Sequence, residues 1–198
     1  VAAVAQQLVN YFSVFEHCRV VTKGMLCLRC GKRQAKHGYC RQCLGKIIVA
    51  RARKILAKED TYVAFGKGWQ DIASRAGFVV EKGKEDRING YAHLFCDRQL
   101  HARLAKDKKK ALISLPIDAQ LQCFLQQLFK GKGKLESMDP IPIPATKEEL
   151  YAYSGQLYKS DTDEARILDK MESRYPGSKF SLYNAFRRLS LSSIHETG

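Results

Sequence analysis

Apolar residues recur at every third or fourth position in two stretches near the start of the chain, which is the spacing of an amphipathic helix. In the first stretch, residues 1–17, no charged residue precedes Glu16. In the second, residues 44–58, apolar positions face one way and lysines and arginines face the other; the inward positions are Ile47, Ile48, Ile55 and Leu56. We therefore expect a docking helix at the N-terminus, followed by a basic helix with one buried face.

Short β-prone runs alternate with helical patterns in the rest of the chain. The expected strands cover residues 61–65, 78–80, 111–116 and 141–143, and the main expected helices cover residues 69–76, 91–108, 118–129, 161–173 and 178–190. Gly77 is placed to end the first of these helices, and Asp118 is placed to cap the third at its N-terminus. Thr146 and Glu149 have the spacing of a capping box for a further helix. Strands alternating with helices predict an α/β fold with a parallel sheet and flanking helices.

Four cysteines form two C-x2-C pairs, Cys27-x2-Cys30 and Cys40-x2-Cys43, separated by nine residues. Two such pairs present thiolates from adjacent tight turns, which is the arrangement of a tetrahedral structural Zn²⁺ site. Because four cysteines leave no open coordination position, we expect the metal to stabilise the fold and not to take part in chemistry. An iron–sulfur cluster on the same four cysteines, or His37 in place of one thiolate, are the alternatives.

The net charge and the number of cysteines indicate which kind of partner and which cellular compartment to expect. The chain of 198 residues has 34 lysines and arginines against 20 acidic residues, a net charge of +14, and residues 17–58 contain no aspartate or glutamate. Such an excess favours nucleic acid as the partner. An odd count of seven cysteines, with two metal-type pairs, favours a reducing compartment. No apolar run approaches the roughly 18 residues of a membrane span, so we expect no membrane association.

The chain therefore divides into three expected parts: an N-terminal helix (1–17), a zinc module with its basic helix (18–58) and an α/β domain (59–198). In the third part, a glycine-containing turn at residues 66–71 follows the first strand. Further motifs follow in order: F-C-D-R-Q at 95–99, L-I-S-L-P-I-D at 112–118, F-K-G at 129–131, I-P-I at 141–143 before E-E-L at 148–150, and R-Y-P-G at 174–177 before Phe186.

In this order, and behind a four-cysteine knuckle, these motifs resemble the tRNA 2-thiolation enzymes of the PP-loop ATPase superfamily over about residues 25–190. The resemblance implies a shrunken PP-loop-like parallel sheet. It also implies an active site that has been lost. Trp69 stands where the phosphate-binding lysine belongs, Asp118 alone remains of an acidic pair, Gln99 replaces the cysteine that should accompany Cys96, and no cysteine follows Cys123. We therefore expect a protein that is not an enzyme.

The predicted function is non-catalytic RNA binding as a structural subunit of a ribonucleoprotein, with a ribosome, mitochondrial or otherwise, as the first candidate. The alternative is an inactive partner subunit in tRNA wobble-uridine 2-thiolation. In either case the partners are rRNA or tRNA and other protein subunits, in the mitochondrial matrix or the cytoplasm; the matrix is considered because the chain begins at Val1 without methionine. The expected RNA contacts are Arg29, Lys32, Arg33, Lys36, Arg41, Arg51, Arg53, Lys54, Lys130, Lys132 and Lys134.

Overall fold

A computed structural model describes residues 26–35, 38–83, 106–131 and 140–195 of the chain. Its strands are β1 (Thr61–Phe65), β2 (Val80–Lys82), β3 (Lys109–Pro116) and β4 (Ile141–Ile143), and its helices are α2 (Arg41–Ile55), α3 (Lys67–Ala76), α5 (Ile117–Phe129), α6 (Lys147–Ser154), α7 (Asp163–Arg174) and α8 (Ser178–His195). The predicted N-terminal helix (1–17) and most of the predicted helix at 91–108 lie outside the described residues.

The four strands form one parallel sheet in the order β2-β1-β3-β4. Val63 is paired with Glu81 of β2 on one side and with Ala111 of β3 on the other. The predicted parallel α/β sheet with flanking helices is therefore confirmed. Strands β1 and β4 have the predicted ends, β2 lies two residues later than predicted, and β3 begins two residues earlier.

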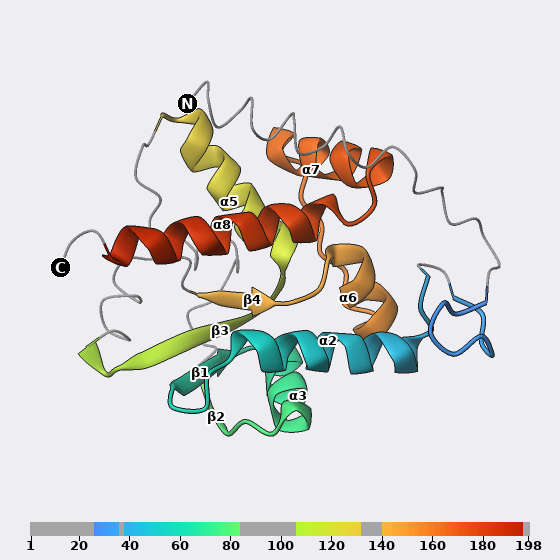
Figure 1. Ribbon diagram of the computed structural model, residues 1–198, viewed down its shortest axis with the longest axis horizontal. Helices are drawn as coiled ribbons and strands as arrows, with labels where there is room; N and C mark the ends of the chain where they lie inside the picture. Colours follow the sequence, from blue (N-terminus) through green and yellow to red (C-terminus); the bar gives the residue numbers. More distant parts are fainter. Residues whose placement is uncertain (1–25, 36–37, 84–105, 132–139, 196–198) are drawn as a thin grey trace.

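Helices cover both faces of the sheet, as parallel sheets require. Figure 1 shows α2 and α3 on one face and α5, α7 and α8 on the other. Alternate residues of β1 divide between the two layers: Tyr62 and Ala64 join the core under α2 and α3, whereas Val63 and Phe65 join a second cluster on the α5 side. The period of two along the strand is thus used on both sides, since both faces are buried.

Four helix starts differ from the sequence prediction. Helix α2 begins at Arg41 and not at residue 44, and helix α7 begins at Asp163 and not at residue 161. Helix α3 begins at Lys67 and not at Trp69, because Gly66, with φ of 87°, makes the whole turn from β1 by itself. Helix α5 begins directly after Pro116, and Asp118, predicted as its N-cap, lies inside the first turn. Its carboxylate accepts a hydrogen bond from the Lys147 backbone N–H instead. The predicted capping box of Thr146 and Glu149 is confirmed at the start of α6.

In the part of the chain that the structure describes, none of the helices combines the length and apolar character needed to cross a membrane.

Candidate functional site

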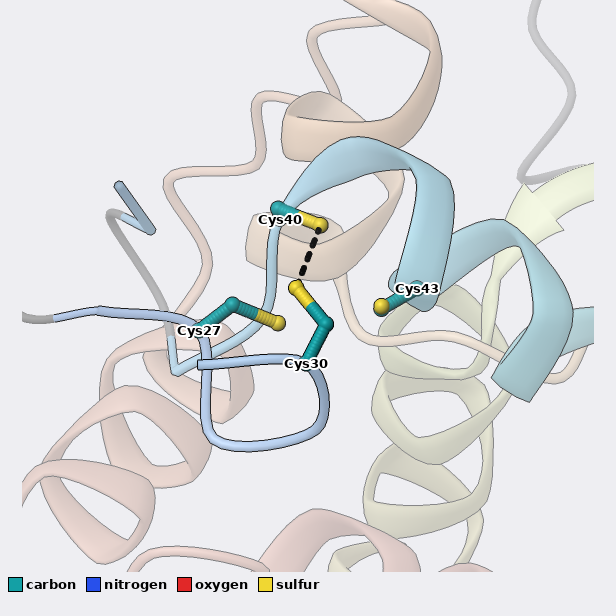
Figure 2. Close-up of side chains that lie close together, drawn as sticks. All are labelled: Cys27, Cys30, Cys40 and Cys43. Atoms are coloured by element: carbon teal, nitrogen blue, oxygen red, sulfur yellow. Dashed lines mark hydrogen bonds between the residues drawn. The ribbon is translucent and has the colours of Figure 1, made fainter. Parts of the chain in front are cut away.

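Four thiol side chains converge at the N-terminal end of α2. Cys27 and Cys30 come from the turn that precedes the helix, Cys40 is the residue at its N-cap, and Cys43 lies in its first turn. All four Sγ atoms lie within 4.8 Å of one another, and Cys30 Sγ and Cys40 Sγ are 3.9 Å apart. Figure 2 shows the sulfur atoms pointing toward a common centre. These four cysteines could hold a metal ion, as the spacing of the pairs predicted.

Backbone hydrogen bonds build this knuckle from a short piece of chain. The Cys27 carbonyl accepts from the Gly31 N–H at 2.8 Å, and the Leu28 N–H donates to the Gly38 carbonyl, also at 2.8 Å. Gly31 and Gly38 have φ of 65° and 77°, in the left-handed region that favours glycine. Gly31, directly after Cys30, and Gly38, just before Cys40, therefore let the chain turn at each cysteine pair.

The thiols differ in how readily they ionise. Burial raises the pKa of Cys27, but the backbone N–H groups of Cys40, Cys30 and Arg29 stabilise its thiolate and bring the pKa down to about 6. Burial, with the adjacent thiols, raises the pKa of Cys43 to about 12. Thiolates packed this closely repel one another, so full ionisation of the quartet requires a cation at its centre.

The crevice between the carboxyl ends of β1 and β3 is a second candidate ligand site. The connection after β1 leads to α3 on one face, and the connection after β3 leads to α5 on the other, which makes this the topological switch point where open α/β sheets bind ligands. The turn after β1 consists of Gly66 alone, since β1 ends at Phe65 and α3 begins at Lys67. A turn of one residue has little backbone with which to surround a phosphate group.

Trp69 packs beside this crevice. Its side chain is fully buried in the core under α2 and α3, and its indole Nε1–H donates to the Ile141 carbonyl at 3.1 Å. Its backbone N–H, in the first turn of α3, donates to Ser114 Oγ at 3.0 Å. One of the N–H donors that a phosphate could use at this helix end is therefore already bound to the protein's own hydroxyl group.

The connection between α6 and α7 lies across the same crevice from outside. The Gln156 side-chain amide donates to the Ser114 carbonyl at 2.9 Å, and Tyr158 packs against the Val63 and Phe65 cluster. Gly68 approaches β3 and β4 so closely that a Cβ atom there would come within 2.9 Å of the Ile143 side chain. The Ser114 hydroxyl group and carbonyl at the switch point are thus both bonded to other parts of the protein.

We expect Ser114→Ala to lower the free energy of unfolding by about 1–2 kcal/mol, because the buried Trp69 N–H loses its acceptor. Denaturant titration measures the change. Ser173→Ala, at an exposed serine on α7, is the matched control and should stay within about 0.5 kcal/mol of the parent. Equal stability of the two variants would contradict a closed and satisfied crevice.

Sequence reasoning did not anticipate a buried ionic cluster on the other side of Asp118. The ammonium group of Lys179 in α8 is fully buried and lies 2.5 Å from Asp118, 2.9 Å from Asp169 and 3.3 Å from Glu148. The three carboxylates lie within 4.8 Å of one another, and the lysine occupies the place that a cation would take. Burial alone would lower the pKa of Lys179, but these carboxylates outweigh it and raise that pKa. The cluster joins α5, α6, α7 and α8.

The predicted RNA-contact residues differ in how exposed the structure shows them to be. Arg29, Lys32, Arg33, Arg41, Arg53, Lys54 and Lys130 are exposed or partly exposed on the surface; Lys36, Lys132 and Lys134 lie outside the described residues. Arg51 was predicted to face outward but is partly buried. Its guanidinium binds the Glu149 carboxylate at 2.7 Å and lies 3.9 Å from the centre of the Phe180 ring. Helix packing, and not solvent, holds this side chain.

A cleft of about 540 Å³ opens beside the knuckle, and its lining includes Arg33, Arg41, Gln42, Asp71, Arg75 and Tyr153. Arg33 belongs to the knuckle, Arg41 begins α2, Arg75 ends α3 and Tyr153 lies in α6. Sequence reasoning missed Arg75, Asp71 and Tyr153, because nothing in their spacing links them to Cys27 or Cys43. The cleft exists only because α2, α3 and α6 meet at this corner of the fold.

No protein-family model matches the chain, and no curated protein matches it at a significant level. Among solved structures, the U34-tRNA thiolase NcsA from Methanococcus maripaludis, with its [4Fe-4S] cluster, is similar to this chain at 16% sequence identity and a TM-score of 0.49. The match covers 86% of this chain and 88% of that chain. A likeness this distant assigns the chain no family, cofactor or activity.

Proposed function

We propose that the protein is a non-catalytic RNA-binding protein, stabilised by a structural zinc ion and working as a subunit of a ribonucleoprotein. The observation that carries this proposal is a contrast between two sites. The four thiols at the start of α2 are held together by their backbone, whereas at the crevice where a nucleotide would bind the Ser114 hydroxyl group and carbonyl are already bonded to Trp69 and Gln156. This contrast supports binding over nucleotide chemistry as the role of the protein.

Zinc is the metal that fits the spacing of the thiols. With Zn–S bonds of about 2.3 Å, a regular tetrahedron places its sulfur atoms about 3.8 Å apart. Cys30 and Cys40 Sγ lie 3.9 Å apart, and all four atoms lie within 4.8 Å. In an iron–sulfur cluster the four cysteines are divided among two or more iron atoms, so the four sulfur atoms must stand farther apart than the ligands of a single ion. The compact quartet favours one ion.

RNA is favoured as the partner because of where the positive charge lies. The net charge is +14, and the residues around the knuckle and along α2 include the exposed side chains of Arg29, Lys32, Arg33 and Arg41. Arginines and lysines on one surface bind the phosphate backbone by displacing its counterions. A zinc module that fixes such side chains in place reduces the conformational entropy lost on binding.

The proposal also names the ribonucleoprotein to which the protein would belong. A ribosome, in the mitochondrion or elsewhere, is the first candidate. The order of the sequence motifs supports a second candidate, an inactive subunit of a tRNA wobble-uridine 2-thiolation complex. The first predicts that the native protein sediments with ribosomal particles through a high-salt gradient. The second predicts that it co-purifies with an active thiolase and with tRNA.

The test of the proposed function is a pair of binding measurements on the purified full chain. We expect single-stranded or tRNA-sized RNA to bind with an affinity that falls as salt rises. In the same buffer with Mg²⁺, calorimetry should detect no heat of ATP binding and no ATP should be hydrolysed. Tight ATP binding would overturn the non-catalytic part of the proposal. A protein that binds zinc but no RNA at physiological salt would overturn the RNA-binding part.

A further inference from the structure

We propose that the cleft between the knuckle, α2, α3 and α6 is the place where the protein holds an RNA phosphate, with Arg33, Arg41 and Arg75 as its ligands. This inference rests on the proposed function and deepens it, because it names one site among many basic side chains. The three guanidinium groups come from the knuckle, α2 and α3. Arg33 and Arg41 lie near one another in the sequence, whereas Arg75 is distant and is brought to the cleft by the fold.

The three arginines are oriented by neighbouring groups that use only part of their hydrogen-bonding capacity. Arg41 donates through Nε to the Tyr153 carbonyl at 2.7 Å. Arg75 donates through one terminal nitrogen to the Tyr153 hydroxyl group, and Arg33 donates through one to the Gln42 side chain. A guanidinium group has five N–H donors in a rigid fork. Each arginine is therefore held in position with further donors available to an anion, which is how a preorganised phosphate site is built.

The N-terminal end of α2 adds to the positive potential of the cleft. Arg41 and Gln42 are the first two residues of this fifteen-residue helix, no acidic residue lies in its first turn, and no side chain caps it. The first N–H groups of a helix and its dipole both favour an anion at this end. The helix end and the three arginines thus act on the same space.

Among the described residues that line the cleft, Asp71 is the one carboxylate. It accepts a hydrogen bond from the Tyr153 hydroxyl group at 2.7 Å and lies 3.6 Å from Arg75. Together with the three arginines, Asp71 leaves a net charge of +2 on the four charged side chains of the lining. The Asp71 side chain is 59% exposed. Asp71 therefore orients Arg75 through Tyr153 while opposing the anion, and both effects can be tested by removing its charge.

Gly45 shows why α6 can lie this close to α2. A Cβ atom at this position would come within 2.8 Å of the Tyr153 ring and 3.4 Å of an Arg75 nitrogen. Glycine inside a helix is destabilising by about 0.5–1 kcal/mol relative to alanine. The close approach explains the residue: the absence of a side chain lets Tyr153 reach both Arg41 and Arg75, so that one tyrosine positions two of the three arginines.

The chemistry of the cleft favours RNA over an acidic protein. Planar, bidentate donors match the oxygen geometry of phosphate as well as that of carboxylate, but the described lining residues are charged or polar apart from the Tyr153 ring, without the aliphatic side chains that form the dry core of a protein interface. The knuckle also carries Arg29 and Lys32 as exposed side chains, which add to the basic surface available to a polynucleotide backbone.

The test uses the full-length, zinc-loaded chain and a short single-stranded RNA, with binding followed by fluorescence anisotropy over a range of salt concentrations. Each phosphate contact contributes about 0.7 to the slope of log K against log salt. We expect R33Q/R41Q/R75Q to lower that slope by about 2 and to weaken binding about 100-fold at 0.1 M salt. The control K159Q/K170Q/R174Q removes the same charge from exposed positions on and near α7 and should weaken binding less than about threefold.

Misfolding would weaken RNA binding, so a variant that binds RNA more tightly separates the effect of charge from that of misfolding. Asp71→Asn is such a variant. Removing the opposing charge should tighten RNA binding by up to about fivefold at 0.1 M salt. Inorganic phosphate, AMP and polyglutamate are added as competitors. Polyglutamate that displaces RNA from the parent but not from the triple variant would show an acidic-protein site and overturn the inference. RNA binding that falls equally in the triple variant and its control would overturn it as well, while leaving the proposed function intact.

Discussion

Lys179→Met is expected to lower the free energy of unfolding by about 3 kcal/mol near pH 7. The substitution keeps the length of the side chain but removes the ammonium group that lies 2.5 Å from the buried Asp118 carboxylate. Losing one partner of a buried ion pair costs about 3–5 kcal/mol, because the remaining charge is left without compensation. We take the lower end of this range because Glu148 and Asp169, at 35% and 42% exposed, remain partly solvated.

The loss should depend on pH in a defined direction. Without the ammonium group, the pKa of each of the three carboxyl groups rises in the folded protein, since like charges within 4.8 Å oppose ionisation. A carboxyl group whose pKa is higher in the folded than in the unfolded chain favours folding as it becomes protonated. The difference between parent and variant should therefore be largest above pH 6 and should shrink as the pH falls toward about 4, the ordinary range for Asp and Glu.

Chemical denaturation of both proteins between pH 4 and pH 7.5 measures this. Lys170→Met, at an exposed lysine on α7, is the matched control and should change stability by no more than about 0.5 kcal/mol at any pH. If Lys179→Met lost the same free energy at pH 4 as at pH 7.5, the effect would come from packing and not from the charge cluster.

Cys40→Ser is expected to abolish stable zinc binding. Cys40 is the ligand that joins the knuckle to α2, because it is the N-cap residue of that helix. Changes in groups that only support the metal ligands weaken metal binding by about 10–100-fold, so the loss of a ligand should exceed that range. After dialysis against a mild chelator, the parent should retain its zinc by elemental analysis and the variant should not.

The same variant should lose RNA affinity, since Arg33 and Arg41 are carried by the chain between and beside the cysteines. Cys123→Ser changes a cysteine on α5 that is remote from the quartet and should leave zinc content and RNA binding unchanged. Visible absorption and bound iron in the freshly purified parent, with no zinc, would replace the proposed ion with an iron–sulfur cluster. If the variant lost zinc but kept its RNA affinity, the metal would not be needed to form the RNA-binding surface.

Much of the fold was available from local patterns in the sequence. The spacing of the four cysteines, the strands at 61–65 and 111–116, the left-handed Gly77 and the Thr146 capping box all appear where the sequence predicted them. Each depends on residues within a few positions of one another, so spacing and propensity are enough to specify it.

The misjudged residues are those whose partners lie far along the chain. Asp118 reads locally as an N-cap, but its carboxylate meets the Lys147 backbone and the Lys179 ammonium group. Arg51 reads as a solvent-facing position on a basic helix, but Glu149 and Phe180 hold its guanidinium group. A charged side chain that is removed from water without a partner is costly, so it pairs with whichever opposite charge or polar group the packed helices bring next to it. Only the packing of the helices identifies that group.

The sequence by itself determined that this protein has a metal-type cysteine quartet, a strong positive charge and an alternating α/β pattern, because spacing, charge and periodicity are properties of the chain. Only the tertiary structure decided that Trp69 and Gln156 bond to Ser114 at the switch point, and that Arg33, Arg41 and Arg75 share one cleft. Both depend on how closely separate helices and strands approach one another, and that distance is set by the packing of the whole core.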